Sequence, residues 1–154
     1  AAELGAISAD HLVYISDAGI KAMAQSGTFA VLLPGTTFSL GHSQYAPARK
    51  MIDAGVTVAL STDCNPGSSY TESLPFITSL AALHFRMSAA EALAAVTVNA
   101  ACAVGRQKTL GRLEPGMKAD IVIWDMQNYR ELPYHYAVNL VSRVIKSGKV
   151  VVSH

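Results

Sequence analysis

The residues best suited to chemistry lie between Val56 and Ser69. A short run of apolar and β-branched residues, 56–60, ends in Ser-Thr-Asp, and the polar sequence Asn-Pro-Gly-Ser-Ser follows. An apolar run of this length, bounded by turn residues, is typical of a strand buried in a parallel sheet. The strand would carry the carboxylate of Asp63 at its C-terminal end, which is where α/β barrels place catalytic and metal-binding groups.

The loop after Asp63 is a second candidate feature. Gly67 and Ser68 have backbone N–H groups that we expect close to a helix start, where anionic ligand groups bind well. A purely structural interpretation also fits these residues. An aspartate after a strand often serves only as a turn or cap residue, and Asn65 or Ser69 could cap a helix equally well. The local sequence leaves both interpretations open.

The composition argues against several classes of function. The chain has 154 residues, of which 51% are hydrophobic and 15% charged, and its formal net charge is +1. Without a basic cluster, the sequence predicts no binding to nucleic acid or to an anionic membrane. No apolar run approaches the roughly 20 residues of a membrane span, and the N-terminus does not resemble a signal peptide. Two well-separated cysteines, Cys64 and Cys102, suit a reducing cytoplasm.

A strand–helix pattern repeats three times before residue 64. We expect strands within 4–12, at 29–33 and at 56–60, helices from Ser16 to Gly27 and from Pro47 to Ala54, and a loop over 36–43 after a stop at Pro34-Gly35. Parallel strands joined by crossover helices have their C-terminal ends at one edge of the sheet. His11 and Asp63 should therefore face a common crevice. Because three such strands leave open sheet edges, the pattern indicates part of something larger.

Helices and then a small β module are expected in the rest of the chain. Capping-box spacings at Ser69/Glu72 and Ser88/Glu91 predict two helices, and a short third helix should begin at Thr97 and end before Gly105. The remaining elements are a strand over 119–125, irregular structure with one helical turn over 126–140, and a hairpin turning at Ser147-Gly148. The isolated histidines His84, His135 and His154 lack ligand-like spacing, and we interpret them as structural or terminal residues.

These motifs resemble those of metal-dependent amidohydrolases. The similarity covers S-T-D-C-N-P-G-S-S, T-V-N-A-A and G-x-L-E-P-G-x-K-A-D-I-V-I-W-D. Within that group, A-D-H-L, V-L-L-P-G-T-T-F, N-P-G-S-S and N-Y-R-E-L-P-Y-H-Y resemble the imidazolonepropionase family of histidine degradation. The resemblance implies an α/β fold. Residues 1–105 would form the C-terminal portion of a TIM-like (β/α)8 barrel, as three parallel βα units, and 106–154 part of a small β-sandwich domain.

The resemblance also implies roles for individual residues. Asp63 would bind a single divalent zinc or iron ion and take the proton of the attacking water, while His11 would orient or stabilise the reacting group. Asn65, Gly67 and Ser68 would line the substrate site. The reaction would open the cyclic amide of 4-imidazolone-5-propanoate to N-formimidoyl-L-glutamate, with the metal lowering the pKa of bound water to about 7. The enzyme would be a cytoplasmic homodimer acting on a small molecule.

The sequence departs from this family in ways that matter. It lacks the His-x-His pair, the strand-five segment with a metal-binding histidine and a catalytic glutamate, and the substrate-binding arginine, and Cys64 replaces an aromatic residue. Since a catalytic zinc usually has three protein ligands, we expect the isolated chain to bind metal weakly or not at all, and to be inactive. Two alternatives remain: another amidohydrolase, such as a deaminase or a dihydropyrimidinase-like enzyme, or a non-catalytic fragment that pairs its sheet edges.

Overall fold

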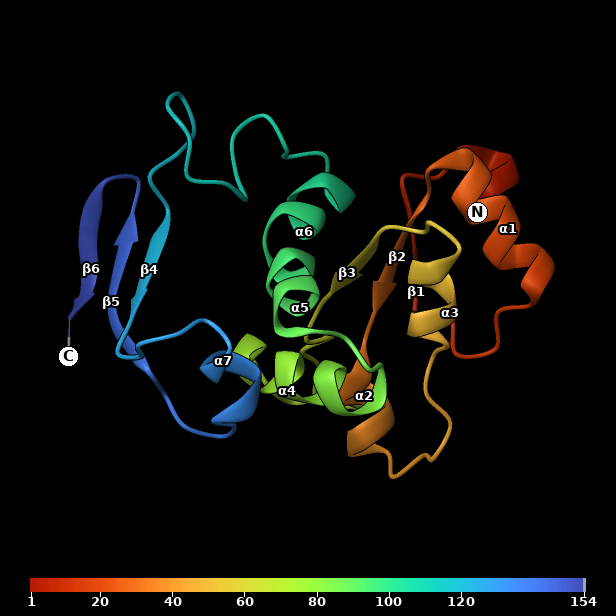
Figure 1. Ribbon diagram of the computed structural model, residues 1–154, viewed down its shortest axis with the longest axis horizontal. Helices are drawn as coiled ribbons and strands as arrows, with labels where there is room; N and C mark the ends of the chain where they lie inside the picture. Colours follow the sequence, from red (N-terminus) through yellow and green to blue (C-terminus); the bar gives the residue numbers. More distant parts are fainter. Residues whose placement is uncertain (154) are drawn as a thin grey trace.

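The computed structural model shows an α/β fold. It contains two separate three-stranded sheets, with helices between and around them. The structure describes residues 1–153, so the interpretation of His154 falls outside it. Figure 1 shows helices α5 (Ala89–Val96) and α6 (Val98–Ala103) between the two sheets. Along the chain, the strands of the parallel sheet precede these two helices and those of the antiparallel sheet follow them.

The parallel sheet has the order β1-β2-β3. Its strands are β1 (Ser8–Asp10), β2 (Phe29–Leu32) and β3 (Val58–Leu60), and both pairings are parallel, as predicted. The crossover from β1 to β2 is helix α1 (Asp17–Ser26), where the Ser16 side chain accepts a hydrogen bond from the Gly19 amide at 3.1 Å. Helix α3 (Ala48–Asp53) leads into β3. The helices between these parallel strands thus give the βαβ arrangement that the sequence predicts.

The hydrophobic core lies around β2 and β3. Leu32, Met51 and Ile77 are among the largest side chains that are fully buried. Ile77 belongs to helix α4 (Leu74–His84), and helices α3, α5 and α6 pack against β3. All three residues of β3 are buried, in agreement with its near-continuous apolar sequence. This packing holds the strand that carries Asp63.

Two local predictions about helix starts are wrong. The loop predicted to follow Pro34-Gly35 is instead largely replaced by helix α2 (Pro34–Ser39). Pro34 begins this helix, because proline suits the first turn of a helix. Ser69 does not cap the next helix, since α4 begins at Leu74 and the Ser73 side chain accepts from the Phe76 amide at 3.3 Å. The predicted capping box at Ser88/Glu91 is present at the start of α5.

Thr97 lies between α5 and α6, as predicted for the start of the third helix. Its hydroxyl does not cap α6, because it donates back to the Leu93 carbonyl at 2.7 Å. The short helix nevertheless follows directly and ends before Gly105, which has a φ of 68°. Backbone conformation, rather than a side-chain cap, therefore marks this boundary.

The antiparallel sheet has the order β4-β5-β6. Its strands are β4 (Ile121–Trp124), β5 (Val141–Lys146) and β6 (Lys149–Ser153). The one-turn helix α7 (Glu131–Tyr134) lies between β4 and β5 in the chain. Ser147 and Gly148 have φ values of 49° and 79°, as a two-residue hairpin turn with both residues left-handed requires. None of the helices within residues 1–153 has both the length and the apolar character needed to cross a membrane.

Candidate active site

His11 and Asp63 meet at the C-terminal edge of the parallel sheet. His11 directly follows β1, and its backbone amide donates to the Val31 carbonyl of β2 at 3.0 Å. Asp63 lies three residues after the end of β3. The Nε2 atom of His11 is 3.9 Å from Oδ2 of Asp63. The structure thus brings together the two side chains that the strand pattern placed at one edge.

The backbone at these positions has an unusual conformation. His11 and Asp63 have φ values of 66° and 51°, in the left-handed region that residues with a Cβ rarely adopt. Such conformations tend to occur where the surrounding fold holds a functional side chain in a required direction. The His11 side chain is 52% exposed and that of Asp63 is 27% exposed, so both remain accessible to a small molecule.

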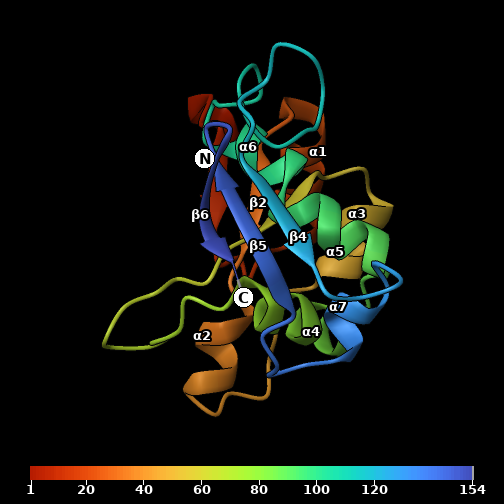
Figure 2. The ribbon, with the colours of Figure 1, turned by 90° about the vertical axis from the view of Figure 1, so that its left-hand side faces the viewer.

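Thr36 is the member of this site that the sequence interpretation missed. It lies in the first turn of α2, and its Oγ1 donates to Oδ2 of Asp63 over 2.6 Å. The sequence pattern predicts only a loop over 36–43. A usable signal was present, because β2 is the middle strand and residues just after it must lie between the ends of β1 and β3. Figure 2 shows α2 close to the loop that follows β3.

The loop after Asp63 is organised by the Asn65 side chain. Its Oδ1 accepts from the amides of Gly67 and Ser68 at 2.8 and 2.9 Å, and its Nδ2 donates to the Asp63 carbonyl at 2.7 Å. The expectation that these amides lie at a helix start is wrong, since α4 begins only at Leu74. Gly67 does not adopt a positive φ, but a Cβ there would lie 3.2 Å from Oδ1 of Asn65. The loop is therefore closely tied to the backbone of Asp63.

Asp63 is suited to serve as one metal ligand. Its Oδ2 accepts from Thr36, while Oδ1 has no hydrogen bond within residues 1–153. In the described part of the chain, no three His, Cys, Asp or Glu side chains converge as a metal cluster. A catalytic zinc site usually needs three protein ligands. The carboxylate fits a divalent ion, and a catalytic site of this kind would need further ligands besides Asp63.

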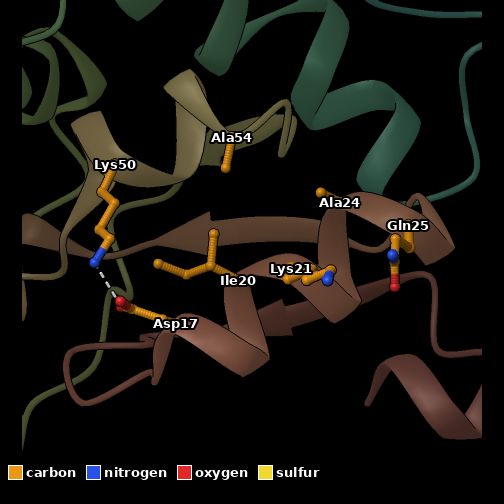
Figure 3. A pocket seen from close by; sticks show the side chains of 7 residues that line it. All are labelled: Asp17, Ile20, Lys21, Ala24, Gln25, Lys50 and Ala54. Carbon is orange, nitrogen blue, oxygen red and sulfur yellow. Dashed lines mark hydrogen bonds and ion pairs between the residues drawn. The ribbon is translucent and has the colours of Figure 1, made fainter.

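Figure 3 shows a groove between α1 and α3. It has a volume of about 380 Å³, and Ile20, Ala24 and Ala54 contribute its apolar lining. At one end Lys50 forms an ion pair with Asp17, so these two charges satisfy each other. The groove shares no residue with the His11–Asp63 site and does not extend it.

Comparison with known proteins identifies the family of the chain. The model of the amidohydrolase family matches residues 4–151, which is nearly the whole chain. The chain belongs to the amidohydrolase family. Among curated proteins, it is 63% identical to the imidazolonepropionase of Bacillus velezensis over 153 residues, and 59% identical to that of Geobacillus thermodenitrificans. Each alignment covers 99% of this chain but 36% of the relative, so the chain spans about a third of the proteins it matches.

Solved structures support the fold assignment. A zinc-bound adenosine deaminase from Xanthomonas campestris matches with a TM-score of 0.83 and 25% identity, covering 95% of this chain and 37% of that protein. The atrazine chlorohydrolase of Arthrobacter aurescens, complexed with zinc, matches with a TM-score of 0.84 and 28% identity, covering 95% and 36%. These proteins confirm the α/β barrel class, and their zinc supports a divalent metal in the family.

Proposed function

We propose that the complete protein containing this chain hydrolyses the cyclic amide of 4-imidazolone-5-propanoate to N-formimidoyl-L-glutamate. The observation that carries this proposal is the 63% identity to an imidazolonepropionase across 99% of the chain. The deaminase and chlorohydrolase structures are much less similar, at 25% and 28% identity. Fold similarity alone does not identify a substrate, so sequence identity around the site has more weight.

In the proposed reaction, Asp63 acts as metal ligand and as proton acceptor. A bound divalent ion would supply Lewis-acid chemistry and lower the pKa of water. The carboxylate of Asp63 accepts the proton from the attacking water and delivers it to the ring nitrogen as the C–N bond breaks. His11, whose Nε2 lies 3.9 Å from Oδ2 of Asp63, orients the carbonyl that is attacked. Both residues come from strand ends that the sheet holds in place.

The loop of Asn65, Gly67 and Ser68 is proposed to bind the substrate. Because Oδ1 of Asn65 already accepts from both backbone amides, the loop would contact the propionate mainly through side chains and by shape. The hydroxyl of Ser68 lies 3.0 Å from Nδ2 of Asn65 and is held close to Asp63 through that amide. An alteration of Asn65 or Gly67 would therefore change the shape of the loop that is proposed to bind the substrate.

Further properties belong to the same proposal. The metal is one zinc or iron ion, and the zinc-containing structures of the family support a divalent ion. The enzyme would be a homodimer in the cytoplasm, and the free thiols of Cys64 and Cys102 suit a reducing compartment. Gel filtration of the complete enzyme with light-scattering detection would test the dimer.

A chimeric enzyme would test the activity. In the Bacillus velezensis relative, the 153 matching residues would be replaced by this chain. We expect hydrolysis of 4-imidazolone-5-propanoate and no turnover of adenosine, guanine or hydantoin. Replacing Asp63 with asparagine should abolish kcat, because this change removes the proton acceptor and a charged metal ligand. A folded, metal-loaded chimera that acts on adenosine and not on the imidazolone would refute the proposal.

A further inference from the structure

The side chain that holds the Asp63 carboxylate belongs to a different strand–helix unit. Oγ1 of Thr36, in the first turn of α2, donates to Oδ2 of Asp63 over 2.6 Å. This distance is in the short range typical of a hydroxyl that donates to an ionised carboxylate. His11 lies 3.9 Å from the same oxygen, which is too far for a hydrogen bond. Within residues 1–153, Thr36 is thus the side-chain donor to Asp63.

Close packing brings α2 to this position. A Cβ added to Gly35 would lie 2.9 Å from Cδ1 of Ile77 and 2.9 Å from Oγ of Ser69. Glycine therefore lets the start of α2 approach the end of β3. Ser69 is only 2% exposed, and its hydroxyl donates to the Thr62 carbonyl at 2.8 Å. This hydrogen bond therefore also holds Thr62, the residue before Asp63, close to the start of α2.

A second contact restrains the other end of α2. The rings of Phe38 and Phe76 meet edge to face, with their centroids 5.5 Å apart, and this packs α2 on α4. The backbone of α2 is thus restrained on both sides of Thr36. A hydroxyl on a restrained helix can select the orientation of a carboxylate that is 27% exposed.

We propose that Thr36 is a positioning residue for the reaction: its hydroxyl orients the Asp63 carboxylate so that Oδ1 is the oxygen available to a metal ion. The inference rests on the function proposed above. Hydrogen-bond partners of ligating carboxylates typically contribute 10–100-fold to metal affinity or activity. A residue that serves only the fold would instead change stability and leave these quantities unaltered.

The test uses the chimeric enzyme with matched substitutions. Thr36→Val removes the hydroxyl and keeps the shape, Thr36→Ser keeps the hydroxyl, and Thr37→Val makes the same change at the neighbouring buried threonine. We expect Thr36→Val to lower kcat and zinc affinity by about 10–100-fold. KM should change by less than about 3-fold, since the change affects the reacting groups rather than substrate binding. Thr36→Ser and Thr37→Val should stay within about 3-fold of the parent in all three quantities.

Zinc affinity, measured by competition with a chelator, separates this inference from the proposed function. A chimera that folds but is inactive would count against the imidazolone reaction. In that case, the difference in zinc affinity between Thr36→Val and Thr36→Ser would still decide the role of Thr36. Parent-like zinc affinity in Thr36→Val, or an equal loss in Thr36→Ser, would overturn the inference. If Thr36→Val fails to fold, Thr36→Ala must show the same losses.

Discussion

Replacing Glu91 with glutamine should destabilise the chain at neutral pH and have little effect in strong acid. Glu91 joins two helices that pack beside β3. Its Oε1 and Oε2 accept from the Arg49 guanidinium at 2.9 and 3.1 Å, and Oε2 also accepts from the Ser88 amide at 2.8 Å. The contact links α3 to the start of α5, so removing its charge tests whether this link stabilises the fold.

The size of the effect follows from the surroundings of the carboxylate. Hydrogen bonds from Arg49 and then from the Ser88 backbone lower the pKa of Glu91 from 4.5 to about 2. Taken at full value, this change corresponds to about 3 kcal/mol. The side chain is 33% exposed, so solvent screening reduces the contribution to about 1–2 kcal/mol. Glutamine can still accept from Ser88, so the substitution chiefly removes the ion pair.

The direction of the pKa shift determines how the stabilisation by Glu91 depends on pH. Because the pKa of Glu91 is lower in the folded state, its stabilisation is complete above about pH 4.5 and is lost as the pH falls towards 2. Urea unfolding of the parent and Glu91→Gln chains, followed by circular dichroism, should show a difference of about 1–2 kcal/mol at pH 7. This difference should shrink towards zero near pH 2. The exposed Glu72→Gln variant is the control and should match the parent.

A difference between the Glu91 variant and the parent that is independent of pH would refute this reasoning. It would mean that glutamine disturbs the packing between α3 and α5 instead of removing a charge. A double-mutant cycle with Arg49→Met would separate the two cases, because the coupling energy must also disappear in acid.

Three further predictions concern the site and its supporting helix. The isolated chain should hold less than one zinc or iron ion after gel filtration, because Asp63 is its one recognisable ligand; a tightly held ion lost on Asp63→Ala would contradict this. In the chimera, Gly67→Val and Asn65→Ala should each raise KM by about 10-fold or more, and an unaltered KM in both variants would remove the loop from the substrate site. Ser73→Ala should lower the free energy of unfolding by about 1 kcal/mol, as expected for loss of an N-cap and measurable by urea unfolding.

Much of the fold could be predicted because its causes are local. The apolar runs at 29–33 and 56–60 are bounded by residues that interrupt strands, and Ser16, Gly27 and the Ser88/Glu91 box act over a few residues. Parallel topology then requires the strand ends to share one edge. This geometric rule was enough to place His11 and Asp63 together, although they are 52 positions apart in the sequence.

Side-chain partnerships within the site were decided by the tertiary structure. No local pattern reveals that Thr36 donates to Asp63, because the contact depends on how closely Gly35 lets α2 approach β3. The loop amides were expected to be free, but the side chain of Asn65 folds back and accepts from them. Sequence spacing determines which face or edge a residue occupies. The direction and partner of each polar group depend on atoms that packing brings in from distant parts of the chain.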